Sequence, residues 1–207
     1  MKTRDKILET GLHLFNKFGV SQVSSRTISQ ELGISYGNLT YYFSRKDDII
    51  LALYTNMQQE LEQKIMLIFQ QVFEESFQKN ILHSIFELTL KYKFIYLSIT
   101  ELSRQFEEIR AAEHKYFENR IRITKKIFTD LIREGYIKQE DYVDNSLTIR
   151  GLDLIFRSWI IDAETFYKGE DADKIDYYSN MIFNLVAPHL TELGLQKFKK
   201  IRGMKEV

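Results

Sequence analysis

The chain of 207 residues contains no cysteine, one proline and nine glycines. The absence of cysteine excludes disulfides, thiol redox chemistry and cysteine-ligated metals, and it fits a reducing cytoplasm. Because proline and glycine interrupt helices and build the turns between strands, their scarcity favours long helices over a β-sandwich. Apolar residues make up 44% and charged residues 28%, which is ordinary for a globular protein. We therefore expect an all-α fold.

Long apolar runs are also missing. The most apolar short run of the long central helix, residues 65–69, is far below the roughly 20 residues that span a bilayer. The first residues, MKTRDKILETGLHLF, alternate charged and apolar side chains, whereas a signal peptide has an unbroken apolar centre. These patterns predict a cytoplasmic protein without a membrane partner.

The sequence contains no pattern of histidines and no phosphate-binding loop that would indicate catalysis. The four histidines are scattered, without the i, i+4 pairing of a zinc-binding helix: His13, His83, His114 and His189. Neither a P-loop nor a G-x-G-x-x-G loop is present. We therefore expect no enzyme activity, no catalytic residue, no metal site and no cofactor, and each histidine is more simply explained as a surface or hydrogen-bonded residue.

The most informative stretch is Val23 to Lys46, VSSRTISQELGISYGNLTYYFSRK. It predicts two short helices separated by a turn at Gly33, since glycine tolerates the left-handed conformation that ends a helix. Each helix opens on serines able to cap it and carries two apolar residues four apart: Ser24 or Ser25 with Ile28 and Leu32, and Ser35 with Leu39 and Phe43. This arrangement is typical of a helix-turn-helix, and it points to duplex DNA.

The outward face of the second helix is polar and aromatic and carries no acid: Tyr36, Gly37, Asn38, Thr40 and Tyr42. A surface that meets phosphates and base edges has to avoid carboxylates, so this face suits a major groove. A plain helical hairpin with a solvated face is the alternative.

The charges are unevenly distributed although the net charge is zero. Residues 1–46 hold seven basic and three acidic residues, a net charge of +4, so the remainder carries −4. A basic N-terminal part on an acidic body would turn the N-terminal part toward a polyanion. We therefore expect a DNA-binding head at 1–46 and a second domain at 47–207.

The stretch from Ile7 to Leu53 resembles the N-terminal domain of the TetR family of bacterial transcriptional regulators. The matching pieces are ILETGLHLFNKFGV, TISQELGIS and GNLTYYFSRKDDII. Two positions depart from the family pattern: Ser29 stands where alanine is usual, and Thr40 stands where tyrosine is usual, which shortens one expected DNA contact. The remainder of the chain agrees with the family in length and helical character only.

The resemblance implies DNA-contacting roles for seven residues. Base edges and the nearby backbone would be contacted by Tyr36, Gly37, Asn38 and Thr40. Arg26 would reach a base or a phosphate, and Tyr42 and Lys46 would hold phosphates, which position a protein without reading sequence. Tyr41 either packs inside the domain or touches DNA.

Further helices are predicted along the chain. The first runs from about Lys2 to Phe18, and a long helix from near Ser44 to about Gln71 joins head and body; Ser44 and Asp47 have the spacing of a capping box. The body is expected to contain helices at about 80–97, 100–106, 109–134, 143–167 and 172–189, and the basic tail a short helix.

Residues 152–161, LDLIFRSWII, are apolar nearly all round, so this helix needs two surfaces to cover it. One covering surface lies in the helix's own domain. The other belongs to a second subunit or, alternatively, the helix is central in a monomer and is covered there on both sides. The resemblance implies a homodimer through a four-helix interface of the helices at about 143–167 and 172–189.

The resemblance also implies a pocket for a small-molecule effector, for which an apolar or aromatic compound is preferred. The residues that could line it, or simply form the core, are Phe69, Phe86, Phe117, Ile121, Phe156 and Trp159. Arg157 and Asp162 interrupt the apolar helix and could bind a polar group, pair with each other or pair across a dimer.

We therefore expect a dimer that binds a palindromic operator, represses transcription and is released by the effector, with activation as the other direction of control. Two alternatives stand beside this hypothesis. One is a DNA-binding dimer with no small-molecule ligand, and the other is a small helical enzyme or lipid carrier.

Overall fold

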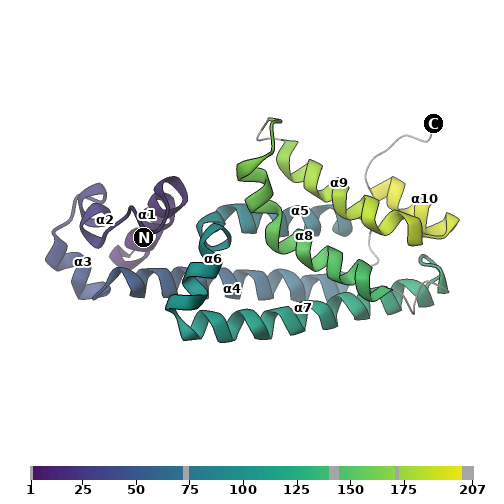
Figure 1. Ribbon diagram of the computed structural model, residues 1–207, viewed down its shortest axis with the longest axis horizontal. Helices are drawn as coiled ribbons and strands as arrows, with labels where there is room; N and C mark the ends of the chain where they lie inside the picture. The colour runs from purple at the N-terminus through teal and green to yellow at the C-terminus, as the bar shows by residue number, and fades with distance from the viewer. Residues whose placement is uncertain (1, 72–74, 140–144, 171–172, 202–207) are drawn as a thin grey trace. The chain divides into compact units, whose positions relative to one another are not determined.

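The computed structural model describes residues 2–71, 75–139, 145–170 and 173–201, and the side chains of these residues except 66–82, 145–146 and 199–201. Every regular element in these ranges is helical (Figure 1). In chain order the elements are α1 (Thr3–Phe18), α2 (Ser25–Glu31), α3 (Tyr36–Tyr42), α4 (Lys46–Gln71), α5 (Glu75–Lys91), α6 (Lys93–Gln105), α7 (Glu107–Arg133), α8 (Asn145–Thr165), α9 (Lys174–Val186), the 3₁₀ turn η3 (Ala187–His189) and α10 (Glu192–Ile201). The all-α prediction is confirmed.

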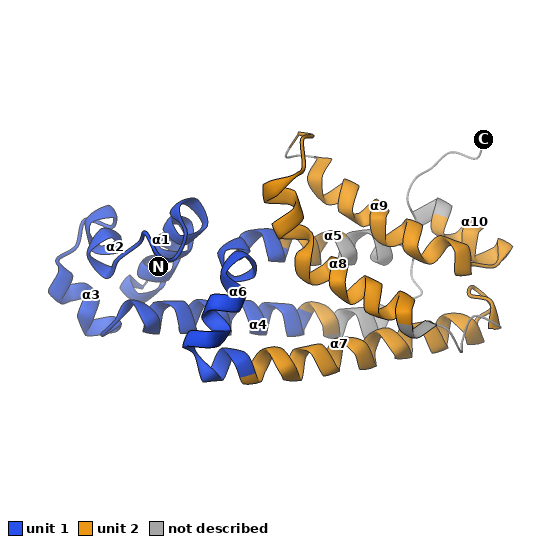
Figure 2. Ribbon diagram, viewed as in Figure 1, with its two compact units in different colours: residues 1–63, 88–110 blue, residues 64–87, 111–207 orange. Residues whose placement is uncertain are grey.

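The chain divides into two compact units (Figure 2). Unit 1 contains residues 1–63 and 88–110, and unit 2 contains residues 64–87 and 111–207. The chain passes from one unit to the other within α4, α5 and α7. Unit 1 therefore includes more than the predicted head, because α6 and the first part of α4 pack with α1–α3. A functional boundary after residue 46 stays a prediction.

The predicted start and stop signals around α2 and α3 are confirmed. The hydroxyl oxygens of Ser24 and Ser35 accept backbone hydrogen bonds from Thr27 and Asn38, each three residues further on. Gly33 has φ 68°, the left-handed conformation in which a side chain would be strained. The apolar residues of the two helices meet inside unit 1, where Ile28 and Leu39 are fully buried.

The predicted cap of α4 uses a different acid. Asp48, rather than Asp47, accepts the hydrogen bond from the Ser44 hydroxyl at 2.6 Å and a second from the backbone N–H of Arg45 at 2.9 Å. The reason is that α4 begins at Lys46, so that Asp48 is the third residue of the helix and can reach back to the free N–H groups.

The break between the fifth and sixth helices was predicted near residues 98–99, and this prediction is wrong. The helices α5 and α6 meet at Tyr92, whose φ of −109° and ψ of 31° depart from helical values. The side chain of Asn16 in α1 bonds to the backbone on both sides of this junction, at Lys91 and Phe94. A tertiary contact therefore fixes the break, which local sequence does not signal.

Unit 2 contains α8 and α9, which pack against each other, and most of α7. The predicted helices at 109–134, 143–167 and 172–189 correspond to α7, α8, and α9 with η3, and α10 confirms the helix of the tail. Their apolar core is formed by Phe128, Leu131, Ile137, Ile149, Leu152, Val186 and Leu190. Among the described residues, no helix is long and apolar enough to cross a membrane.

Candidate nucleic-acid interface

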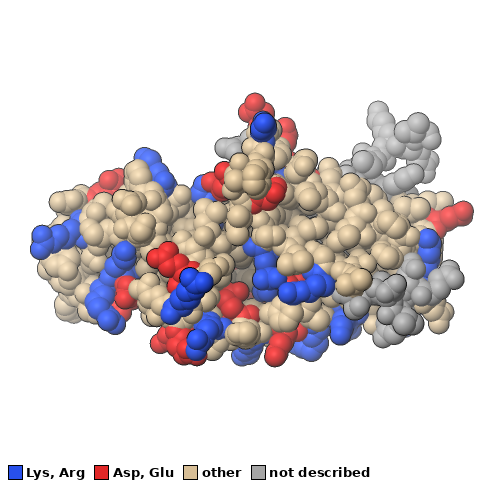
Figure 3. All heavy atoms as spheres, in the orientation of Figure 1, with Lys and Arg blue, Asp and Glu red and all other residues tan. Residues whose placement is uncertain are grey.

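The helix α3 has one buried and one exposed face, as its sequence predicts. Leu39 is fully buried, and Phe43, which follows the helix, is also buried. The exposed face presents Tyr36, Gly37, Asn38, Tyr41 and Tyr42, while Thr40 is half-buried. Figure 3 shows more basic than acidic side chains on the drawn surface of the head that carries α1–α3. Six of the seven predicted DNA-contacting residues lie in α2 and α3, and Lys46 is the first residue of α4.

The turn into α3 contains a sequence that resembles a catalytic motif. Residues 33–37, GISYG, match the letters of the G-x-S-x-G nucleophile elbow. That elbow joins a strand to a helix and exposes an activated serine. Ser35 instead joins two helices, and its hydroxyl accepts the N–H of Asn38 at 3.1 Å. This serine is therefore a helix cap.

Three side chains of the face are positioned by contacts within the head. The guanidinium carbon of Arg26 lies 5.4 Å from the centre of the Tyr36 ring, a cation–π distance. The hydroxyl of Thr40 donates to the carbonyl of Gly37 at 3.1 Å. The side-chain amide of Asn38 has no hydrogen-bonding partner among the described residues, and the residue is exposed. Its donor and acceptor are therefore available to a base edge.

Lys46 is held at the edge of this face. Its ammonium donates to the backbone carbonyl of Val20 at 2.9 Å, which ties the start of α4 to the connection after α1. An ammonium has three donors, so this bond leaves others for a phosphate oxygen.

Tyr41 does not pack inside the domain. It is 83% exposed, and its ring meets that of Tyr42 edge-on, with the ring centres 5.1 Å apart. Helical periodicity contains this information, because two residues further along a helix is a rotation of about 200° away from buried Leu39. Tyr41 therefore joins the exposed face, although the sequence left its role open.

Asp48, the acid that caps α4, has a lowered pKa. The hydrogen bond from the Ser44 hydroxyl, followed by the one from the Arg45 N–H, holds the pKa of Asp48 below its ordinary value of 3.8. The carboxylate thus stays charged at the helix N-terminus, where negative charge is favourable.

The six residues predicted to line an effector pocket are only partly brought together. The Phe86 ring centre is 5.6 Å from that of Phe156 and 4.8 Å from that of Trp159. Phe117 instead lies beneath the guanidinium of Arg150, and Ile121 packs against the core of unit 2. The side chain of Phe69 lies outside the described part of the chain. Phe86 and Trp159 are almost completely buried, as core residues are.

An open depression of about 570 Å³ lies near the end of α8 and contains none of those six residues. Its lining residues are Asp162, Phe166, Tyr167, Lys168, Gly169, Tyr177 and Tyr178. The Tyr178 hydroxyl donates to Asp162 at 2.5 Å, and burial, with this bond second, raises the pKa of Tyr178 above its ordinary value of 10.0. Asp162 is thus occupied by Tyr178, while Arg157 pairs with Asp153, so the two do not pair with each other.

Comparison with known proteins gives matches over most of the chain. Residues 7–53 match the family model described as bacterial regulatory proteins, tetR family. Residues 56–198 match the model described as bacterial transcriptional repressor. A probable HTH-type transcriptional regulator, YttP of Bacillus subtilis (strain 168), is 26% identical over 151 residues, which are 69% of this chain and 69% of the relative.

Solved structures share the fold. A TetR-family transcriptional regulator from Marinobacter aquaeolei VT8 has a TM-score of 0.86 at 22% identity, with 100% of both chains covered. A putative transcriptional regulator from Saccharomonospora viridis in complex with choline has a TM-score of 0.70 at 19% identity, covering 91% of this chain and 97% of that one. With both family models matched in order, the chain belongs to the TetR family of bacterial transcriptional regulators, which are DNA-binding proteins and not enzymes.

Proposed function

We propose that this regulator binds a palindromic DNA operator as a dimer, represses transcription and is released by a small-molecule effector. The observation that carries the proposal is the exposed face of α3, which is capped, packed from behind by Leu39 and free of acids. Such a helix can enter a major groove without repelling the phosphates on either side.

Some of the proposed contacts read base edges, and others position the protein on the phosphate backbone. Asn38 reads a base edge, because its amide donates and accepts at once, as adenine requires. Tyr36, Gly37 and Thr40 approach neighbouring base edges and backbone, and Arg26, held over Tyr36, reaches a base or a phosphate. Tyr42 and Lys46 hold phosphates. The exposure of Tyr41 adds a further candidate contact to this set.

An apolar stripe on α8 supports the proposed dimer. Leu147, Leu154 and Ile161 are seven residues apart and are 76%, 47% and 44% exposed. Residues at this spacing lie along one side of a helix and form the contact line of paired helices. On α9, Tyr177 and Met181 are exposed four residues apart. A second copy covering both helices would remove this surface from water, and its α3 would reach the second half-site of the operator.

Release by an effector is proposed through unit 2. A ligand that binds one arrangement of the dimer better than another shifts the spacing between the two α3 helices, so that they no longer fit successive major grooves. The choline bound by the Saccharomonospora viridis relative supports a ligand-responsive body of this fold. The almost complete burial of Phe86 and Trp159 favours the second candidate, a dimer without a ligand.

A fluorescence-anisotropy titration tests the proposal. The labelled duplex is the DNA upstream of the protein's own gene, since such regulators often control their own or adjacent genes, and the competitor is a scrambled duplex of equal length. We expect saturation at two protomers per site, preference for the natural duplex, and affinity that falls steeply with salt. Absence of binding to either duplex at low salt would contradict DNA binding itself.

A further inference from the structure

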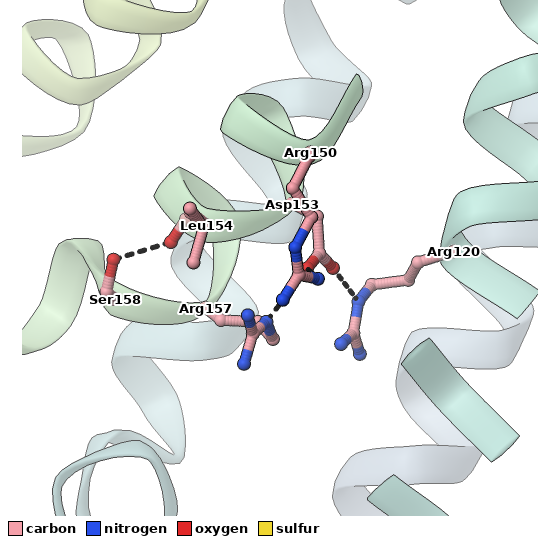
Figure 4. Close-up of polar contacts among 6 residues, drawn as sticks. All are labelled: Arg120, Arg150, Asp153, Leu154, Arg157 and Ser158. Carbon is pink, nitrogen blue, oxygen red and sulfur yellow. Dashed lines mark hydrogen bonds and ion pairs between the residues drawn. The ribbon is translucent and has the colours of Figure 1, made fainter. Parts of the chain in front are cut away.

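Three arginines converge on one buried carboxylate in unit 2 (Figure 4). Asp153 is 5% exposed and accepts hydrogen bonds from Arg120 of α7 at 2.9 Å and from Arg150 and Arg157 of α8 at 2.8 and 3.0 Å. The arginine cluster, as we name Arg120, Arg150 and Arg157, therefore surrounds a single acid.

The cluster carries more positive charge than its acid can balance. Three guanidinium groups remain protonated at any physiological pH, and one carboxylate neutralises only one of them. Within the described residues, Asp153 is the acid that pairs with each arginine of the cluster. The side chains of Arg150 and Arg157 are 45% and 38% exposed, so water solvates part of their charge, whereas that of Arg120 is 21% exposed. A bound anion would balance the positive charge that Asp153 leaves over.

The donors are also incompletely used. The Nη2 atom of Arg120 is buried and has no hydrogen-bonding partner among the described residues. Most buried side-chain nitrogens in folded proteins have a hydrogen-bond partner, so this donor is available to an oxygen atom of a bound molecule. In Figure 4 the guanidinium groups of Arg120 and Arg157 reach beyond Asp153 toward the same side, one from each helix. Their forked shape suits the two oxygens of a carboxylate or the oxygens of a phosphate.

Apolar side chains border the cluster. The guanidinium carbon of Arg150 lies 4.6 Å from the centre of the Phe117 ring. Phe156 precedes Arg157 on α8 and joins the aromatic group of Phe86 and Trp159. Phe117 and Phe156 are half-buried, whereas Phe86 and Trp159 are almost completely buried. A ligand held at the arginines would therefore place its remaining atoms against the accessible parts of Phe117 and Phe156.

We propose that the arginine cluster binds the oxyanion group, carboxylate or phosphate, of an amphiphilic small molecule whose apolar part lies against Phe117 and Phe156. The proposal rests on the proposed effector-controlled function and specifies the chemical class of the effector. The sequence favours an apolar or aromatic effector, whereas the arginine cluster favours an effector that carries a negative charge at one end.

Calorimetric titration of the DNA-free protein tests the site with three probes of equal chain length: octanoate, octyl phosphate and the neutral octanamide. At least one anionic probe should bind saturably, and octanamide at least tenfold more weakly. The better of the two anions identifies the headgroup. Equal binding of octanamide, or no saturable binding of either anion, would overturn the proposal.

Variants separate ligand binding from structural support. Arg157→Gln, the more exposed position, and Arg120→Gln should each weaken binding of the preferred anion tenfold or more. Arg122→Gln, an exposed arginine of the same helix α7 outside the cluster, should leave it unchanged. Folding is checked by circular dichroism, and Arg157→Gln serves alone if Arg120→Gln unfolds. Anion binding that is unchanged in Arg157→Gln would contradict the site.

Two further measurements distinguish a failure of the proposed ligand site from a failure of the proposed release by an effector. If Arg157→Gln dissociates the ligand-free dimer in sedimentation, the cluster holds an acidic group of the second copy, and the ligand proposal is wrong. If the anion binds through the arginines but leaves operator affinity unchanged, the site stands and release by an effector fails.

Discussion

The backbone N–H of Phe94 donates to the side-chain carbonyl of Asn16 at 3.0 Å, and the amide of Asn16 donates to the carbonyl of Lys91 at 2.8 Å. One side chain of α1 therefore caps the start of α6 and closes the end of α5. The rings of Phe15 and Phe94 pack beside these bonds, with centres 5.2 Å apart. Within unit 1, the helix that supports the DNA-binding hairpin is thus fixed to the α5–α6 junction as well as to α4.

Substitution of Asn16 by alanine should loosen this connection. The N–H of Phe94 lies in a part-buried place and would lose its acceptor, so the free energy of unfolding should fall by about 1–3 kcal/mol. Urea denaturation measures this loss, with His13→Ala on the exposed face of α1 as the control. If the junction also transmits the effector signal, Asn16→Ala should reduce the change in operator affinity that the ligand causes. A stability equal to that of His13→Ala would show that the two bonds contribute little.

The cap of α4 predicts a dependence of stability on pH. Asp48 has a pKa below 3.8 in the folded protein, so its charged form stabilises the fold at every pH above that value. This contribution is lost as the pH falls through the lowered pKa. Asp48→Asn should therefore cost about 1 kcal/mol at pH 7, typical of a helix cap, and progressively less below pH 3.8.

Denaturant unfolding of the unaltered protein and of Asp48→Asn, at pH values from 7 to 2, measures the difference between their free energies of unfolding. Asp47→Asn is the matched control, because among the described residues Asp47 accepts a single bond, 3.5 Å from Gln105, and does not hold the Arg45 N–H. A difference between Asp48→Asn and the unaltered protein that stays constant over the whole range would contradict the assignment.

The sequence predicts the hairpin better than the body for a physical reason. Caps and turns are local: Ser24, Ser35 and Gly33 act within four residues of themselves, so their roles follow from spacing. The break at Tyr92 depends on Asn16, more than seventy residues earlier in the chain, and no local pattern contains that contact. Local patterns also do not predict the ion pair of Arg120 with Asp153, because this pair forms only when α7 and α8 pack together.

Aromatic residues illustrate the same limit. Helical spacing places Phe117, Phe156 and Trp159 on apolar stripes, but it does not say which stripe faces which neighbour. In the structure Phe156 and Trp159 join Phe86, whereas Phe117 supports Arg150. Arg157 looked like an interruption of an apolar helix and is part of an ion-pair network.

Asn38 should affect which sequence is bound. If its amide reads one base pair, Asn38→Ala should cost about 1–3 kcal/mol on the natural operator and relax the preference at that single position. Anisotropy titrations against operators changed at one base pair at a time measure this loss. Thr40→Ser is the mild comparison, because the hydroxyl that bonds to Gly37 is retained. A uniform loss across all operator variants would assign Asn38 to the backbone instead.

Lys46 should affect every duplex alike. Lys46→Ala removes a phosphate contact from each protomer, so affinity should fall for specific and scrambled DNA, and the slope of log K against log salt should flatten by about 0.9 per protomer. The same change removes the bond to Val20, so folding must be checked by thermal unfolding. Lys17→Ala is the control, since that exposed ammonium lies over the Phe18 ring. A slope equal to that of the unaltered protein would remove Lys46 from the contact list.

The apolar stripe of α8 should control assembly. Leu154 lies in the middle of the stripe, and Leu154→Glu would place a carboxylate where the dimer proposal buries a leucine in each copy. Two desolvated like charges oppose association strongly, so sedimentation velocity should show monomers at concentrations where the unaltered protein is dimeric. Operator affinity should fall with it, since one head reads only one half-site. Leu193→Glu on α10, where the leucine is 54% exposed, should remain dimeric. A Leu154→Glu protein that stays dimeric would place the interface on a different surface, while monomers that bind the operator as tightly as the unaltered dimer would contradict two-headed recognition.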